Sequence, residues 1–150
     1  MNKIDAVEIL IVEDTPQDLE LTLRALRKAK LSNRIQVARD GAEAIEFIFC
    51  EGEHAGRKIE DGPRVILLDL KLPKIDGIEV LRRVKSDART KSIPVVVLTS
   101  SKEQKDVVES YQLGVNSYIV KPVNFEGFAE AVQHFGMYWL LLNQPPRIEK

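Results

Sequence analysis

The chain has 150 residues, of which 44% are hydrophobic and 30% are charged, with a formal net charge of −1. This length suits one domain with a buried core, and the balanced charge disfavours a general nucleic-acid binder. The single cysteine, Cys50, excludes an internal disulfide, and the first apolar run is too short for a signal peptide or a membrane span. We therefore expect a cytoplasmic protein that binds neither nucleic acid nor membrane directly.

In chain order, the apolar run EILIV at 8–12 predicts a strand. Leucines at helical spacing after Pro16 predict a helix that begins near this proline. RIQVA at 34–38 predicts a second strand, and an apolar stripe after the turn at 40–41 predicts a second helix. Residues 51–63 are polar, with three glycines and a proline, and predict a long exposed loop.

The same alternation continues in the next third of the chain. RVILLD at 64–69 predicts a third strand, and Asp76 is a natural N-cap for the helical pattern that follows. IPVVVLT at 93–99 predicts a fourth strand, and 103–113 predicts a helix.

SYIV at 117–120 predicts the fifth strand, and apolar residues at helical spacing from Phe125 to Trp139 predict a fifth helix. Strands that alternate with helices favour parallel pairing, because right-handed crossovers place the helices on both faces of the sheet. We therefore expect one α/β domain over 1–150, with a doubly wound sheet of five parallel strands.

Polar side chains follow four of the predicted strands: Glu13 with Asp14, then Asp69, Thr99 and Lys121. Each has an ordinary explanation when taken alone, since an aspartate after a strand commonly serves a turn. The carboxyl ends of parallel strands meet at one edge of a sheet, where functional groups gather. Their joint placement therefore predicts a site.

The three carboxylates of this set repel one another unless a positive charge joins them. Lys121 supplies one charge, and oxygen ligands without His or Cys suit Mg²⁺. We expect Asp14 and Asp69 to ligate the ion directly and Glu13 to hold a bound water. The carbonyl of Lys71 could complete the ring.

A site that gathers phosphate oxygens beside a carboxylate predicts Asp69 as a nucleophile toward phosphorus, which gives an aspartyl-phosphate. The metal and Lys121 would neutralise charge on the transferring group, and the Thr99 hydroxyl would donate to a phosphoryl oxygen. The chain contains no G-x-x-x-x-G-K-[ST] motif, so ATP is not expected to be the donor.

Four segments, ILIVED, VILLDLKLPKIDG, IPVVVLTSS and SYIVKP, together resemble the receiver domain of two-component response regulators, the CheY-like family. The resemblance covers about residues 7–142 and leaves a short tail at 143–150. It implies a flavodoxin-like sheet with strand order 2-1-3-4-5. It also places the family's phosphoacceptor on Asp69, its acidic metal pair on Glu13 and Asp14, and its phosphate-contacting lysine on Lys121.

The family's switch threonine and switch aromatic residue fall on Thr99 and Tyr118. The resemblance implies that Asp69 takes a phosphoryl group from the phosphohistidine of a sensor histidine kinase, with Mg²⁺, and that this switches protein–protein interactions. Such a protein assists its own phosphotransfer and autodephosphorylation, but it is not otherwise an enzyme. Lys71 departs from the commoner uncharged residue at its position, where it could contact the phosphoryl group or slow an attacking water.

The long loop at 51–63 and the ending FGMYWLLLNQPP are similar to stand-alone response regulators paired with phytochromes, which implies a phytochrome-type kinase. Several apolar residues near the end of the last helix lie off its core stripe, namely Met137, Tyr138, Leu141 and Leu142. The tail could cover them, but a symmetric homodimer through helix 4, strand 5 and helix 5 is the favoured interpretation.

The residues around Asp69 are also compatible with two other classes of protein. Haloacid-dehalogenase-type phosphatases also use an aspartyl nucleophile, but theirs lies in an Asp-x-Asp motif. Here Lys71 stands where the second aspartate of that motif would be. A pseudo-receiver that acts only as a binding module is the main alternative. The intact set of Asp14, Asp69, Thr99 and Lys121 argues against it.

Overall fold

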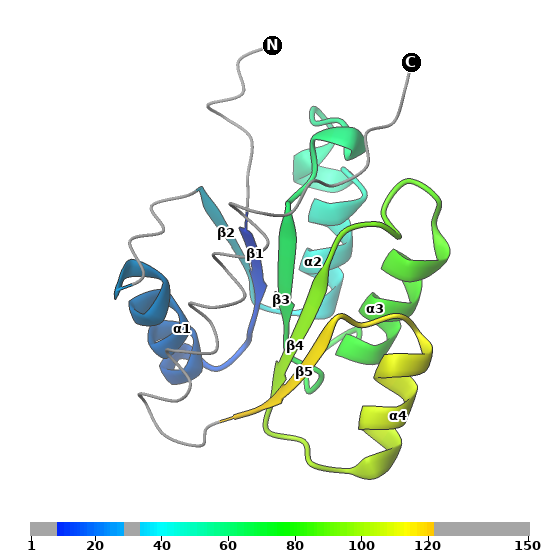
Figure 1. Cartoon of the computed structure of the whole chain (residues 1–150). Helices are drawn as coiled ribbons and strands as arrows, with labels where there is room; N and C mark the ends of the chain where they lie inside the picture. Colours follow the sequence, from blue (N-terminus) through cyan, green and yellow to red (C-terminus); the bar gives the residue numbers. More distant parts are fainter. Residues whose placement is uncertain (1–8, 29–33, 122–150) are drawn as a thin grey trace.

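The structure is a computed structural model that describes residues 9–28 and 34–121. Its sheet contains five parallel strands in the order β2-β1-β3-β4-β5 (Figure 1). The strands are β1 (Ile9–Val12), β2 (Ile35–Ala38), β3 (Val65–Leu68), β4 (Val95–Thr99) and β5 (Ser117–Val120). The predicted flavodoxin-like strand order is confirmed.

The described residues form four α-helices, α1 (Pro16–Lys28), α2 (Gly41–Ile48), α3 (Gly77–Ser86) and α4 (Gln104–Gln112). As predicted, α1 begins at Pro16 and α3 follows the N-cap Asp76, whose carboxylate accepts a hydrogen bond from the Glu79 amide at 3.0 Å. None of these described helices is long and apolar enough to cross a membrane. The predicted fifth helix, from Phe125 onward, lies outside the described residues.

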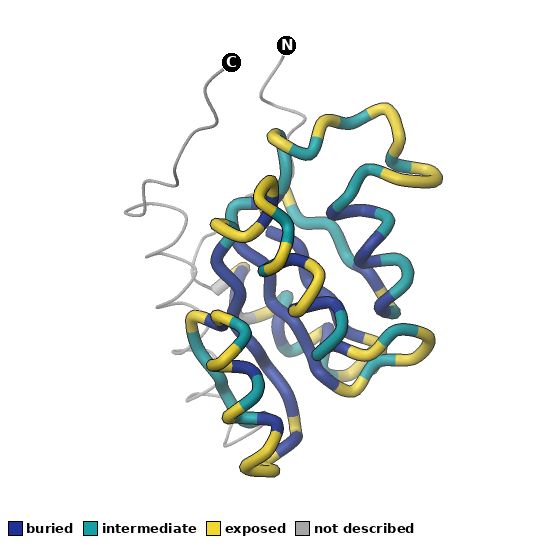
Figure 2. The backbone as a smooth tube through the Cα atoms, turned by 90° about the vertical axis from the view of Figure 1, so that its right-hand side faces the viewer, coloured by how far each residue is buried: buried dark blue, intermediate teal, exposed yellow. Residues whose placement is uncertain are grey.

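Two apolar clusters cover the two faces of the sheet, because successive side chains of a strand point to opposite faces. Leu10 and Leu68 pack in a cluster with residues of α2 and α3, whereas Ile11 and Leu67 pack in a cluster with residues of α1. Figure 1 shows α1 on one side of the sheet and α2, α3 and α4 on the other. The central strands are therefore buried throughout (Figure 2), as their unbroken apolar sequences predict.

The segment at 51–63 is largely exposed, as predicted, but it is not an irregular loop throughout. It contains two short 3₁₀ helices, η2 (Gly52–His54) and η3 (Ile59–Asp61), and it is anchored to α2. The guanidinium carbon of Arg57 lies 3.9 Å from the centre of the Phe47 ring, and the Arg57 side chain donates to the Phe47 carbonyl at 2.7 Å. A cation–π contact that joins distant residues is not visible as a local sequence pattern.

Candidate functional site

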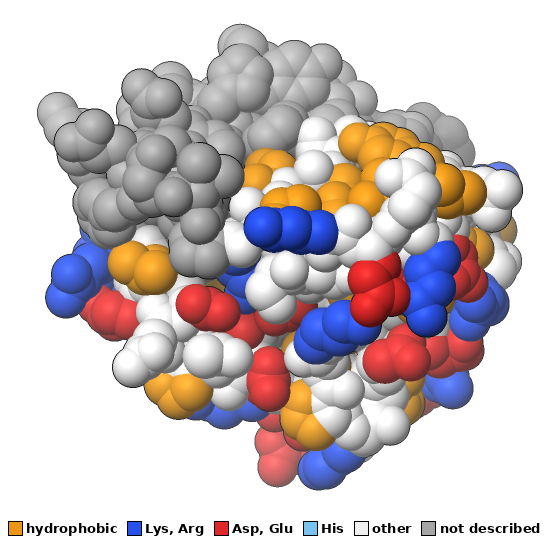
Figure 3. All heavy atoms as spheres, turned by 90° about the horizontal axis from the view of Figure 1, so that it is seen from below, with side chains coloured by type: hydrophobic (Ala, Val, Ile, Leu, Met, Phe, Trp, Pro, Cys, Tyr) orange, Lys and Arg blue, Asp and Glu red, His pale blue; other side chains and the backbone are white. Residues whose placement is uncertain are grey.

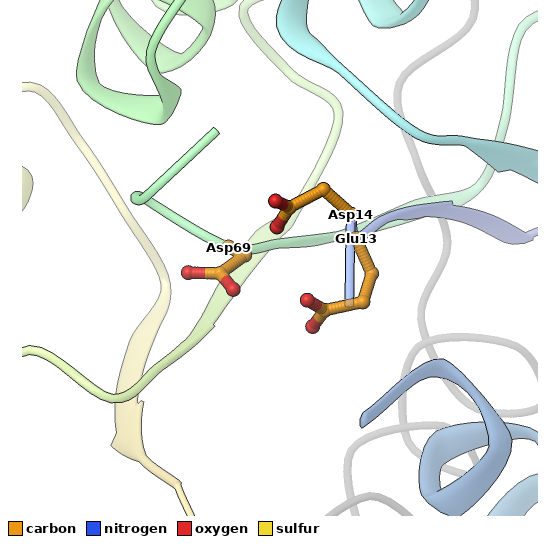
Figure 4. A group of neighbouring side chains, drawn as sticks. All are labelled: Glu13, Asp14 and Asp69. Carbon is orange, nitrogen blue, oxygen red and sulfur yellow. The ribbon is translucent and has the colours of Figure 1, made fainter. Parts of the chain in front are cut away.

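Two acidic residues, Glu13 and Asp69, directly follow the neighbouring strands β1 and β3, whose last residues are paired in the sheet. The Glu13 amide donates to the Ala38 carbonyl at 2.9 Å, and the Asp69 amide donates to the Val12 carbonyl at 3.0 Å. The sheet hydrogen bonding thus continues one residue past β1 and β3 and fixes both acids. With Asp14, they form a group in which one carboxylate oxygen of each residue lies within 4.8 Å of the others (Figure 4).

Lys121 follows β5, and its ammonium reaches across the edge of the sheet to this group. Lys121 Nζ lies 2.6 Å from Glu13 Oε1, 3.2 Å from Asp69 Oδ2 and 2.9 Å from Asp18 Oδ2. Only 4% of the Lys121 side chain is exposed, so the three carboxylates compensate the cost of burying its charge.

Asp18 is a member of the site that the sequence analysis missed. It lies in the first turn of α1, which begins at this edge of the sheet. Its position four residues after Asp14 was a usable signal, because the first turn of a helix that follows a strand stays near the carboxyl edge. An acidic residue in the first turn also commonly stabilises the helix N-terminus. Because that role already accounts for Asp18, the sequence alone did not indicate its contact with Lys121.

Burial and charge act in opposite directions on the ionisable groups of this site. Burial raises the pKa of Glu13 to about 7, against the hydrogen bond and charge of Lys121, which lower it. Burial alone would lower the pKa of Lys121, but its hydrogen bonds with Glu13 and Asp18 and the charge of Asp69 raise that pKa above its ordinary value. Lys121 therefore stays charged at neutral pH, and a divalent cation at the site would favour the charged form of Glu13 as well.

Asp69 is only 5% exposed, although it is an acidic residue at the end of an apolar strand. One of its oxygens accepts a hydrogen bond from the Lys71 amide at 3.1 Å, and the other contacts Lys121. The turn after Asp69 packs tightly against the start of α3. A Cβ at Gly77 would lie 2.3 Å from the Asp69 carbonyl oxygen, so only glycine fits there without a backbone shift.

The donor set of the acidic group fits a hard divalent cation such as Mg²⁺, since it offers only oxygen atoms. Both Glu13 oxygens already have partners, because Oε2 accepts from the Thr15 amide at 3.2 Å and Oε1 contacts Lys121. Asp14 is exposed, with its carboxylate open to solvent and to an incoming ion. Figure 3 views the molecule from this end, and acidic side chains lie among basic ones across it.

The two predicted switch residues share a partner. Thr99 is fully buried, and its hydroxyl accepts a hydrogen bond from the Ser101 amide at 3.3 Å. The Tyr118 hydroxyl donates to the Ser101 carbonyl at 3.0 Å. Ser101 therefore lies between the end of β4 and the aromatic residue of β5.

The sequence matches the family model of the response regulator receiver domain over residues 9–133. It is 41% identical to the response regulator Rcp1 of Synechocystis sp. over 88% of each chain. The Mn²⁺-bound structure of Rcp1 superimposes on it with a TM-score of 0.83, and the match covers 93% of this chain and 99% of that one. The phosphorylated cyanobacterial phytochrome response regulator RcpA is 40% identical, with a TM-score of 0.84 and coverage of 93% and 98%. The bacteriophytochrome response regulator RtBRR is 55% identical, with a TM-score of 0.76 and coverage of 93% and 84%.

Proposed function

The chain belongs to the response regulator receiver domain family, and on that premise we propose that it is a phosphorylation-switched regulator whose phosphoacceptor is Asp69. Receiver domains take phosphoryl groups from histidine kinases and bind Mg²⁺ or Mn²⁺ at an acidic pocket. One observation carries the assignment of the acceptor. The Asp69 carboxylate is held between Lys121 Nζ and the Lys71 amide, beside the carboxylates of Glu13 and Asp14.

In the proposed transfer, an oxygen of Asp69 forms a bond to the phosphorus of a kinase phosphohistidine. The phosphorus–nitrogen bond breaks, and the imidazole nitrogen keeps its electron pair. Lys121 neutralises charge on the phosphoryl oxygens, and the Thr99 hydroxyl donates a hydrogen bond to one of them. These residues provide binding and charge compensation, and the kinase provides the activated phosphoryl group.

A divalent cation is the second part of the proposal. Asp14 and Asp69 would hold Mg²⁺ directly, with Glu13 acting through water and the carbonyl of Lys71 as a further ligand. The bound ion would supply positive charge beside the phosphoryl oxygens. The oxygen-only donor set and the Mn²⁺-bound form of the relative Rcp1 support this assignment.

We also propose the class of kinase and the output. Likeness to Rcp1, RcpA and RtBRR supports a phytochrome-type histidine kinase as the partner. Phosphorylation would move Thr99 toward the phosphoryl group, let Tyr118 follow, and change the protein's contacts with other proteins. The protein would assist its own phosphotransfer and autodephosphorylation, and it would have no other substrate.

Incubation with acetyl phosphate and Mg²⁺, followed by intact-mass measurement, tests this function. We expect one added phosphoryl group on the wild type and none on Asp69→Asn or after chelation of the metal. Asp61→Asn, which changes an aspartate in the η3 segment, is the matched control and should be labelled like the wild type. A wild type that takes no phosphoryl group would overturn the proposal and favour the pseudo-receiver that acts only as a binding module.

A further inference from the structure

Ser101 makes hydrogen bonds through three different groups, its amide, its carbonyl and its hydroxyl. Its amide donates to Thr99 at 3.3 Å, and its carbonyl accepts from Tyr118 at 3.0 Å. Its hydroxyl donates to Asp106 Oδ2 at 2.5 Å, and both residues of this third bond are buried. A movement of Ser101 therefore changes the surroundings of both proposed switch residues.

Asp106 lies in the first turn of α4 and is only 8% exposed. A buried carboxylate costs free energy unless hydrogen bonds and positive charge compensate it. The Asp106 carboxylate accepts a hydrogen bond from the Ser101 hydroxyl and lies at the positive end of the α4 dipole. Its third partner is Lys71, whose Nζ is 3.6 Å from Asp106 Oδ2.

The start of α4 depends on the same pair of residues. Glu103, at the N-cap position of α4, makes no side-chain capping hydrogen bond. The Glu103 amide instead donates to the Ser101 hydroxyl oxygen at 3.4 Å. The contact between Ser101 and Asp106 thus ties the loop after β4 to the first turn of the helix.

Lys71 connects this anchor to Asp69. Its amide donates to Asp69, while its side chain is 59% exposed and free to reorient. A phosphoryl group on Asp69 would bring roughly −1.5 to −2 charges, by analogy with phosphoserine, and three acceptor oxygens. That is more negative charge than the Asp106 carboxylate offers, so the Lys71 ammonium is better placed at the phosphoryl group than at Asp106.

We propose that Asp106 is a positioning residue that holds Thr99 and Tyr118 through Ser101, and that Lys71 exchanges its ion pair with Asp106 for one with phosphorylated Asp69. The inference rests on the proposed function, because it needs Asp69 to be the phosphoacceptor. Once Lys71 leaves, the buried carboxylate of Asp106 loses its ion-pair partner and turns toward solvent. Ser101 is then released, and the start of α4 moves with it.

The positioning part is tested in the free protein by the NMR amide resonances of Thr99 and Tyr118. Asp106→Ala removes the acceptor of the Ser101 hydroxyl and should displace both resonances. Asp106→Asn keeps an acceptor oxygen and should leave them near their wild-type positions. Ser101→Ala removes the same hydrogen bond if Asp106→Ala does not fold. Resonances that stay in place in the alanine variant would overturn the positioning role.

The exchange is tested by titration with beryllofluoride, a tetrahedral stand-in for the phosphoryl group, in the presence of Mg²⁺. In the wild type, Lys71 must leave Asp106 to contact the ligand, whereas in Asp106→Asn it is already free. Lys71→Gln should therefore weaken binding more in the Asp106→Asn background than in the wild type, by a further factor of roughly 5. Lys105→Gln is the matched control, because Lys105 lies in the same turn of α4 and pairs with Glu103 at 3.6 Å.

An equal effect of Lys71→Gln in both backgrounds would overturn the exchange, as would a Lys105→Gln effect with the same background dependence. Failure of the proposed function has a different signature. A wild type that neither binds beryllofluoride nor accepts a phosphoryl group would remove both the function and the exchange. The amide resonances of the free protein would still decide the positioning role of Asp106.

Discussion

The ammonium of Lys121 lies 2.6 Å from Glu13 Oε1, although 108 residues separate the two in the sequence. Both side chains are 4% exposed. The contact joins the residue after β5 to the residue after β1, across the carboxyl edge of the sheet. It holds together a group in which carboxylates would otherwise repel one another.

Lys121→Met should therefore destabilise the protein. The substitution leaves Glu13, Asp18 and Asp69 without the cation that joins them, and we expect the free energy of unfolding to fall by about 3 kcal/mol. Urea unfolding at pH 7 measures this loss. Added Mg²⁺ should recover part of it, by about 2.7 kcal/mol at a concentration 100 times its dissociation constant. Lys58→Met, at an exposed site, is the control, and equal stability of the two variants would contradict the prediction.

Asp14→Asn should affect metal binding far more than stability. Asp14 is exposed, so we expect a change in unfolding free energy within about 0.5 kcal/mol. Loss of a ligand should weaken Mn²⁺ binding at least about tenfold, as measured by calorimetric titration. Asp18→Asn is a useful comparison, because Asp18 contacts Lys121 but is not part of the three-residue acidic group. It should retain most of the affinity, and a reversed order of the two variants would place the ion elsewhere.

Gly77→Ala should destabilise the turn that carries Asp69. The added methyl group would lie 2.3 Å from the Asp69 carbonyl oxygen and 2.5 Å from the Leu70 Cα, and both are backbone atoms that cannot move independently. We expect a loss of about 2–3 kcal/mol in urea unfolding and slower labelling by acetyl phosphate. Gly56→Ala is the matched control, since nothing lies within 4 Å of its added methyl group. Similar stability of the two variants would show that the turn relaxes freely.

The fold could be predicted from the sequence because its determinants are local. Unbroken apolar runs alternate with helical stripes, and parallel pairing follows from that alternation. The candidate site could be predicted in part for the same reason, since Glu13, Asp14, Asp69 and Lys121 each follow a strand directly. The topology then brings the ends of those strands together.

Other parts of the site could not be predicted, because they depend on tertiary contacts between residues with no shared local pattern. Asp106 is an acidic residue in the first turn of a helix, where its sequence context indicates only a dipole or capping role. The stacking of Arg57 on Phe47 likewise depends on how the 51–63 segment folds back on α2. These contacts become visible only when the whole chain is folded.

Lys85 makes the free energy of unfolding depend on pH in the alkaline range. Burial lowers the pKa of its ammonium from 10.5 to about 8, while its Nζ donates to the carbonyls of Lys91 and Ile93. Between these two pH values the unfolded chain binds more protons at this residue than the folded protein does. The contribution of Lys85 to stability therefore rises with pH across that window.

The difference in unfolding free energy between wild type and Lys85→Met isolates this effect, because other groups titrate equally in both proteins. The unfolding free energy of Lys85→Met minus that of wild type should be highest at pH 7 and should fall as the pH rises from about 8 to 10.5. Urea unfolding at several pH values measures the difference. A difference that is constant across the range would contradict the lowered pKa of Lys85.

The last prediction concerns the proposed homodimer through α4, β5 and the helix predicted after them. In the described part of this face, α4 exposes two large apolar side chains, Val108 at 43% and Tyr111 at 53%. A symmetric dimer would bury such a patch twice, once on each copy. Tyr111→Glu would place a charge in that contact and should give a folded monomer at micromolar concentration in sedimentation analysis, whereas Gln17→Glu, at an exposed position on α1, should leave the dimer intact. If the wild type sediments as a monomer with and without phosphorylation, the dimer is excluded.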